Sequence, residues 1–82
     1  MKTYRNQGTC SSSVSFDLRG GKVHNTVFVG GCNGNLKAMG ILIEGKDARE
    51  VIALLKGTTC GHKPTSCADQ LALALEKALA GK

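Results

Sequence analysis

Four cysteines constrain the fold of this 82-residue chain more than any other feature: Cys10, Cys32, Cys60 and Cys67. A domain of this length buries only about 60 % of the surface of its unfolded chain, so its hydrophobic core provides little stability. The chain has no Trp, one Tyr and two Phe, so its core must be built mostly from small aliphatic side chains. Domains of this size often gain stability from disulfides, a metal or a partner, and cysteines can supply the first two.

The start of the chain, MKTYRNQGTC, has no apolar run of the kind found in secretory signals. Nothing in the sequence approaches the roughly 20 apolar residues of a membrane span. We therefore expect a cytoplasmic protein with no membrane segment. Thiols stay reduced in that compartment, where a set of cysteines is more often metal-binding or catalytic than disulfide-bonded.

The net charge is +5, from 11 Lys and Arg against 6 Asp and Glu. The basic residues are scattered, and aromatic side chains that could stack on bases are nearly absent, so the pattern argues against a nucleic-acid-binding protein. Two interpretations of the charge stay open. It belongs to an ordinary solvated surface, or it compensates the negative charge of a metal held by thiolates.

Residues 11–30 are predicted to form a β-hairpin. In SVSFDL, apolar residues alternate with polar ones, which is the period of a half-buried strand. RGGK follows as the turn, because its two glycines can take positive φ. The second strand, KVHNTVFVG, is predicted to place Val23, Val27 and Val29 on one face and Phe28 on the other.

Two helices are predicted after the hairpin. The first, NLKAMGILIEG, has one apolar face, made of Leu36, Met39, Gly40 and Ile43. The second, DAREVIALLKG, begins with Asp47 as N-cap and Glu50 three residues later, which is the capping-box pattern, and Gly57 ends it. Its buried stripe is predicted to be Val51, Leu54 and Leu55.

A third helix is predicted to begin after Thr65 or Ser66. With Ser66 as N-cap, Cys67 is the first helical residue and Asp69 the third. Leu73 lies on another side of this helix, where it forms either a second contact face within the domain or a contact with a partner. The main stripe consists of Leu71, Leu75 and Leu79.

The order of these elements, strands first and then three short helices, predicts a single α+β domain over residues 1–82. Residues 4–9 are a candidate edge strand beside the hairpin. We expect a small antiparallel sheet with the three helices packed on one face.

All four cysteines fall near the ends of predicted elements, and none lies on an apolar stripe, where buried structural cysteines usually occur. This placement suggests that they share one point in space. The spacing differs from that of zinc fingers, whose cysteine pairs lie two to four residues apart. The chemistry still fits zinc, for which four cysteines are a common structural ligand set. Cys67, at a helix start, would have its thiolate favoured by the helix dipole.

Other interpretations of the cysteines stay open: two disulfides, a reactive Cys67 alone or paired with Cys60, or unrelated buried thiols. His62 lies beside Cys60 and could replace one cysteine as a ligand, whereas His24 is expected at the surface. No Ser–His–Asp grouping or carboxylate pair points to a catalytic site. The GGCNGN loop is glycine-rich before a helix, but it matches neither common phosphate-binding motif.

Four stretches, GGCNGNLK, EGKD, LKGTTCG and KPTSCADQLA, together resemble the TSCPD domain family, in particular its small stand-alone members with four cysteines. The resemblance runs from Cys10 to the end of the last helix, and all four cysteines match. One position departs from the motif, because Ala68 stands where the family has proline. Alanine tolerates the same conformation at a helix start, so we expect the site to be kept.

The resemblance implies a metal-binding domain, with zinc held by Cys10, Cys32, Cys60 and Cys67. TSCPD domains occur as C-terminal extensions of adenosylcobalamin-dependent and related ribonucleotide reductases, where they are thought to bind metal through their cysteines. These 82 residues leave no room for a radical-chemistry barrel or a nucleotide site. The expectation is therefore an accessory module for a ribonucleotide reductase or another protein, as a monomer or an oligomer, with no enzyme activity alone.

A second resemblance, over about residues 22–55, is to the iron–sulfur scaffold family. There too a cluster cysteine follows a strand in a glycine-rich loop before a helix. Those scaffolds use three cysteines plus an acidic or histidine ligand, and a fold can be shared without its function. This resemblance implies the alternative function, a thiol redox protein or an iron–sulfur cluster carrier.

Overall fold

Three strands and three helices follow one another in the predicted order. The computed structural model describes residues 2–9, 11–31, 33–59 and 64–81. The elements are β1 (Lys2–Arg5), β2 (Ser11–Arg19), β3 (Lys22–Gly30), α1 (Asn33–Ile43), α2 (Ala48–Leu55) and α3 (Cys67–Leu79). In these ranges, no helix is both long and apolar enough to cross a membrane.

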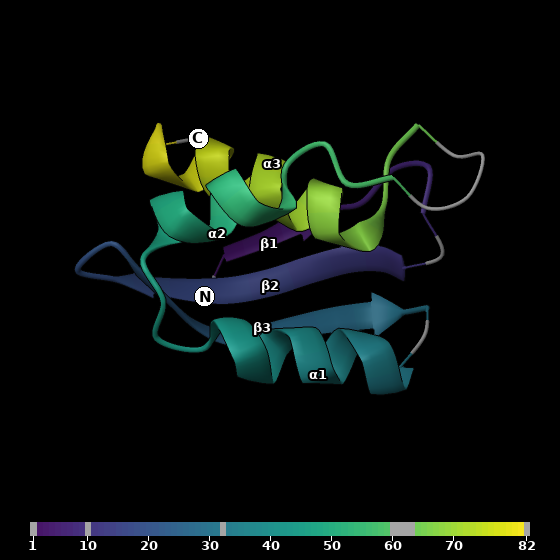
Figure 1. Cartoon of the computed structure of the whole chain (residues 1–82), viewed down its shortest axis with the longest axis horizontal. Helices are drawn as coiled ribbons and strands as arrows, with labels where there is room; N and C mark the ends of the chain where they lie inside the picture. Colours follow the sequence, from purple (N-terminus) through teal and green to yellow (C-terminus); the bar gives the residue numbers. More distant parts are fainter. Residues whose placement is uncertain (1, 10, 32, 60–63, 82) are drawn as a thin grey trace.

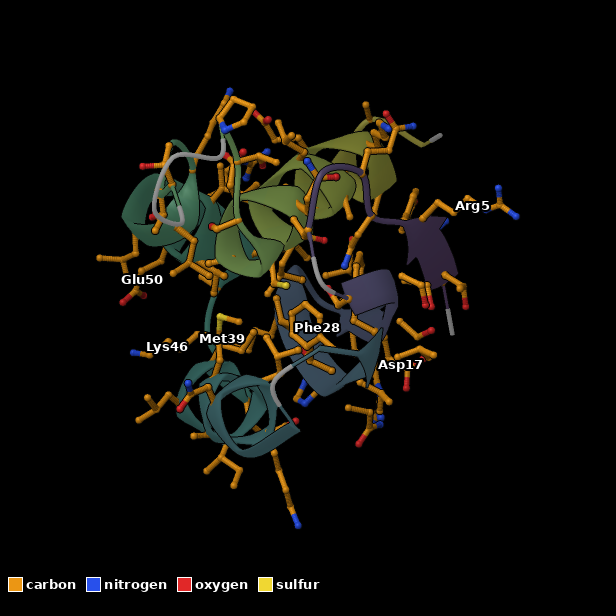
Figure 2. The ribbon with its side chains drawn as sticks, turned by 90° about the vertical axis from the view of Figure 1, so that its right-hand side faces the viewer. Arg5, Asp17, Phe28, Met39, Lys46 and Glu50 are labelled. Carbon is orange, nitrogen blue, oxygen red and sulfur yellow. The ribbon has the colours of Figure 1, made fainter. Side chains whose placement is uncertain are left out.

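The strands form one antiparallel sheet in the order β1-β2-β3. All three helices lie on the same side of it, α1 along β3, and α2 and α3 together over the rest (Figures 1 and 2). The predicted α+β class is therefore confirmed. The edge strand begins earlier than expected, at Lys2, and ends at Arg5.

The inward face of β3 differs from the prediction. Val23 is buried and Phe28 packs against the core, whereas Val27 and Val29 are 51 % and 54 % exposed on the open face of the sheet. The pairing of β2 with β3 shifts register near Asn25, which has a φ of 57°. An extra residue in one strand reverses the alternation of its side chains. The prediction that the three valines share a face is therefore wrong.

The hydrophobic core lies between the sheet and the helices. Its largest fully buried apolar side chains are Phe16, Leu71, Leu75, Val14, Val23 and Val51. The ring of Tyr4 stacks on that of Phe16 with their centroids 5.7 Å apart, so β1 joins the core through one aromatic pair. Alanines supply much of the remaining buried surface: Ala48, Ala72, Ala74 and Ala78. The core is as light as the composition predicts.

Helix α1 turns its predicted face inward. Ile43 is buried, whereas the neighbouring Ile41 and Leu42 are exposed. Met39 and Phe28 both point into the region between α1 and the other two helices (Figure 2). At Gly40 an added Cβ would lie 3.1 Å from the carbonyl oxygen of Thr26, so α1 runs unusually close to β3.

Helix α2 begins as predicted, with the Asp47 carboxylate accepting the Arg49 N–H at 2.9 Å. It ends at Leu55, and Gly57 follows with a φ of 85°. Leu54 is 64 % exposed, so its place in the predicted buried stripe is wrong. The inward stripe follows the i, i+3, i+4, i+7 pattern of a helix face. It consists of Ala48, Val51, Ile52 and Leu55.

Candidate metal centre

One end of the molecule brings together the start of β2, the end of β3 and the starts of α1 and α3 (Figure 1). We call it the cysteine end, and the opposite end, where Arg19 and Lys22 close the hairpin, the hairpin end. Cys67 lies at the cysteine end as the first residue of α3. Cys10, Cys32 and Cys60 lie outside the described residues, as does His62.

Ser66 starts α3 and fixes the position of Cys67. Its hydroxyl oxygen accepts the Asp69 N–H at 3.1 Å, which is the predicted N-cap bond. The same hydroxyl donates to the carbonyl oxygen of Thr58 at 2.7 Å. Ser66 therefore also ties the chain segment that leads to Cys60 to the first turn of α3.

Asp69 makes a second tie between the same two segments. Its carboxylate accepts the backbone N–H of Gly57 at 2.7 Å and a hydrogen bond from the Thr65 hydroxyl. These two donors, the Thr65 hydroxyl first, hold the pKa of the Asp69 carboxyl below its usual value. Since Asp69 is only 9 % exposed, its charge depends on these donors rather than on water.

Cys67 reaches across to the start of β2. Its Sγ lies 2.8 Å from the Oγ of Ser11, which is 2 % exposed. The side-chain amide of Asn6 donates to this Oγ at 2.7 Å. The other nearby hydroxyl, Thr9, is 3.4 Å away and gives its proton to the Ser11 carbonyl. Either atom can donate in this contact, and with Cys67 as a thiolate the Ser11 hydroxyl is the donor.

Ser11 also connects Cys67 to the segment before Cys32. Its pairing partner across the sheet is Gly30, the last residue of β3. Gly30 and Gly31 have φ values of 78° and 79°, which glycine adopts readily, and they turn the chain from β3 toward α1. The predicted sharp loop is therefore confirmed as far as Gly31.

Within the described ranges, no three side chains of His, Cys, Asp or Glu come together as candidate metal ligands. The described His24 lies far from Cys67, toward the hairpin end. It is partly exposed, with its Nδ1 2.6 Å from a carboxylate oxygen of Glu44. The sequence pattern indicates Cys67, Ser66 and Asp69 at this helix start, whereas no sequence signal indicates Ser11 or Asn6.

The family model described as the TSCPD domain matches residues 2–79, nearly the whole chain. Neither the curated proteins nor the solved structures contain a significant match.

Proposed function

The chain belongs to the TSCPD domain family, and we propose that it is a small metal-binding domain in which Cys10, Cys32, Cys60 and Cys67 hold one zinc ion. The contact between Ser11 and Cys67 carries this proposal, because it joins the chain next to Cys10 to the first turn of α3. Four thiolates are a common ligand set of structural zinc.

The reach of the chain supports the proposal for the other two cysteines. Cys32 comes two residues after Gly30, which pairs with Ser11. Cys60 comes two residues after Thr58, which accepts a hydrogen bond from Ser66. One residue spans at most about 3.6 Å. Two residues of chain therefore let Cys32 lie at most about 7 Å from Gly30, and Cys60 at most about 7 Å from Thr58.

The electrostatics of the cysteine end also fit the donor set. A zinc ion with four thiolates carries a net negative charge, and the N-termini of α1 and α3 both lie at this end (Figure 1). A helix N-terminus is the positive end of the helix dipole and favours nearby anions. The Ser11 hydroxyl adds a hydrogen bond to one sulfur, the kind of support that orients metal ligands.

Bound zinc would supply structure rather than reactivity, because a site closed by four sulfurs has no open position for a substrate. It would join β2, the start of α1 and the start of α3, and so stabilise a domain whose core is light. We propose that the domain is an accessory module without enzyme activity of its own, for which a ribonucleotide reductase is the partner that the family suggests.

One observation favours a second candidate function. Cys67 combines a helix N-terminus, which favours a thiolate, with a hydroxyl 2.8 Å from its sulfur that can donate to one. A stabilised thiolate is what a thiol redox protein or an iron–sulfur carrier needs as well. The two candidates differ in what the purified protein contains.

The deciding experiment is elemental analysis of protein purified without oxygen, with a count of reactive thiols and a visible absorption spectrum. The zinc proposal requires about one zinc per chain, a colourless protein, and thiols that react only after a chelator is added. Iron with visible absorption would support the cluster carrier. Absence of metal with reactive thiols would overturn the zinc site in favour of the redox function.

A further inference from the structure

In the part of the chain that the structure describes, no strand pairs with the outer edge of β1. β1 is the first strand of the sheet, so only β2 lies beside it. The Asn6 N–H donates to the Ser12 carbonyl at 2.9 Å, which sets the alternation of hydrogen-bonded pairs along the ladder. By this alternation Lys2 and Tyr4 bond toward β2, whereas the backbone N–H and C=O of Thr3 and Arg5 point outward.

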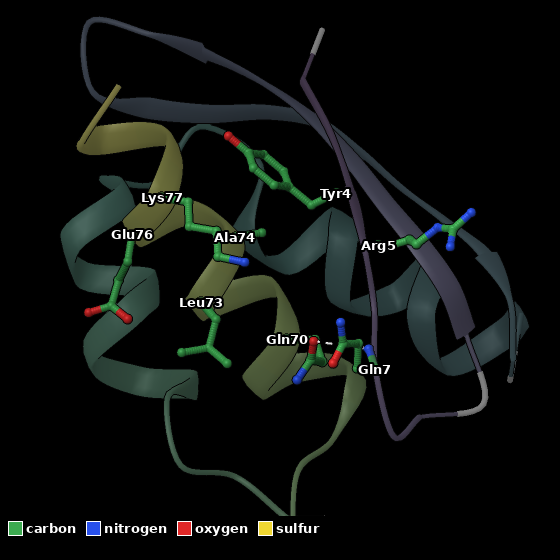
Figure 3. Close-up of a pocket in the computed structure, with 8 residues that line it drawn as sticks. All are labelled: Tyr4, Arg5, Gln7, Gln70, Leu73, Ala74, Glu76 and Lys77. Atoms are coloured by element: carbon green, nitrogen blue, oxygen red, sulfur yellow. Dashed lines mark hydrogen bonds between the residues drawn. The ribbon is translucent and has the colours of Figure 1, made fainter. Parts of the chain in front are cut away.

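A groove runs between this edge and α3. It has a volume of about 320 Å³, and its apolar wall is formed by Tyr4, Leu73 and Ala74 (Figure 3). At one end the N–H of Gln7, the next outward group in the alternation, donates to the side-chain oxygen of Gln70 at 3.1 Å. Helix α3 therefore binds one outward backbone group, the N–H of Gln7. The outward N–H and C=O groups of Thr3 and Arg5 can pair with another chain.

The charge around this edge is positive. Lys77 lines the groove, and the Arg5 side chain points away from it on the other side of β1 (Figure 3). None of the ion pairs formed within the described ranges uses either cation. The acidic residue of the groove, Glu76, is bound to Lys56 at 2.9 Å. A complementary ligand is therefore acidic.

We propose that this edge and groove dock an extended acidic segment of a partner protein, which pairs with β1 as a fourth strand. Such strand addition draws affinity from backbone hydrogen bonds and specificity from the alternating side chains. Apolar side chains of the segment would face Leu73, and carboxylates on its other face would lie beside Arg5. Among the described residues that form this surface there is no cysteine, so the proposal concerns a site other than the proposed metal centre.

A second copy of the chain fits the edge less well than an acidic partner. β1 has only four residues, and both Lys2 and Arg5 are basic. Two β1 strands paired with each other would bring these cations close together, and like charges across a strand pair are destabilising.

The test measures binding of a fluorescent peptide of alternating Val and Glu to the full chain by anisotropy. Thr3→Pro removes an outward N–H, which an edge strand tolerates because that group faces solvent. Thr3→Val is the matched control, because both variants lose the hydroxyl contact with Ser15 and only the first loses the N–H. We expect the wild type and Thr3→Val to bind, and Thr3→Pro to bind about tenfold more weakly, the effect of one backbone hydrogen bond.

A second variant keeps the test decisive if Thr3→Pro unfolds. Arg5 is exposed on β1, and Arg5→Glu should weaken binding of the acidic peptide and permit binding of a peptide with Lys in place of Glu. Equal binding of the acidic peptide by wild type and Arg5→Glu, or no binding to the wild type, overturns the proposal. So does a dimer in sedimentation that Thr3→Val keeps and Thr3→Pro loses, because the occupant is then a second copy.

Discussion

The cysteine end and the hairpin end of the sheet are each fastened by a carboxylate. At the hairpin end, Glu44 accepts the Asn25 N–H at 2.8 Å and contacts His24 at 2.6 Å. These partners, the Asn25 N–H first, lower the pKa of the Glu44 carboxyl. At the cysteine end, Asp69 joins Gly57 and Thr65 in a similar way.

The surroundings of the two carboxylates differ. The Glu44 side chain is 47 % exposed, whereas Asp69 is 9 % exposed. Water competes for an exposed hydrogen bond and screens its charge, so such a contact adds little stability. A buried carboxylate that loses its donors keeps its full desolvation penalty. We therefore expect the contacts of Asp69 at the cysteine end to stabilise the fold more than the similar contacts of Glu44 at the hairpin end.

The largest expected effect comes from removing the proposed zinc ion or one of its proposed ligands. Cys67→Ser should cost a substantial part of the roughly 10–16 kcal/mol that structural zinc contributes in small finger peptides. Thermal unfolding of wild type and variant, each with and without a strong chelator, measures it. The chelator should destabilise the wild type and leave the variant unchanged. Equal stability of the wild type in both conditions would contradict the proposed zinc site.

Asp69→Asn should have the next largest effect. The amide keeps the shape of the side chain but loses the charge that two donors satisfy, so we expect a loss of about 1.5–3 kcal/mol. Urea unfolding at neutral pH measures it. A loss no greater than that of Glu44→Gln would show that burial does not separate the two ends.

Acid should act on the same group. Because the pKa of Asp69 is lower in the folded protein than in the unfolded chain, its contribution is complete above about pH 5 and is lost as the pH falls below about 4. Unfolding free energies between pH 7 and pH 2 should fall steeply for the wild type at the acid end. The profile of Asp69→Asn should be flatter there, and parallel profiles would rule out this origin of the acid sensitivity.

Substitutions at two helix N-caps, which can be compared directly, should have a smaller effect on stability. Ser66→Ala at the cysteine end and Asp47→Ala at the start of α2 should each cost about 1 kcal/mol, the usual value of an N-cap. Only Ser66→Ala also frees the Thr58 segment, so only this variant should speed the release of zinc to a chelator. Equal release rates would mean that the cap does not support the metal centre.

The smallest effect is expected at Glu44. Glu44→Gln should leave the urea midpoint unchanged within error, because its contacts are exposed to water. A clear shift would mean that the hairpin end contributes to stability as much as the cysteine end does.

The sequence was sufficient to predict the elements, because each depends on local signals. The capping residues Asp47 and Ser66 and the turn glycines mark their boundaries within the chain itself. Which face of the sheet a side chain occupies was harder to predict where it depends on how two strands pair. The register shift at Asn25 reversed the faces of Val27 and Val29, since a bulge depends on how two strands align.

Of the described part of the candidate site, only Cys67 and the rest of the first turn of α3 were predictable from the sequence. Asp69 was expected as the third helical residue, but its partner Gly57 comes from the end of another helix. Ser11 stands in a run of three serines, and nothing in the sequence separates it from Ser12 or Ser13. Its burial and its contact with Cys67 arise from the packing of β2 against α3.

The contact between Gly40 and the Thr26 carbonyl has a consequence for how far chains of this kind can vary. A methyl group there would force α1 away from β3 by a few tenths of an ångström. A helix is stiff, so a displacement at its middle is carried to its start at Asn33, directly after Cys32. A homologue could therefore keep every cysteine and still change the spacing of the proposed metal ligands through one residue that binds nothing.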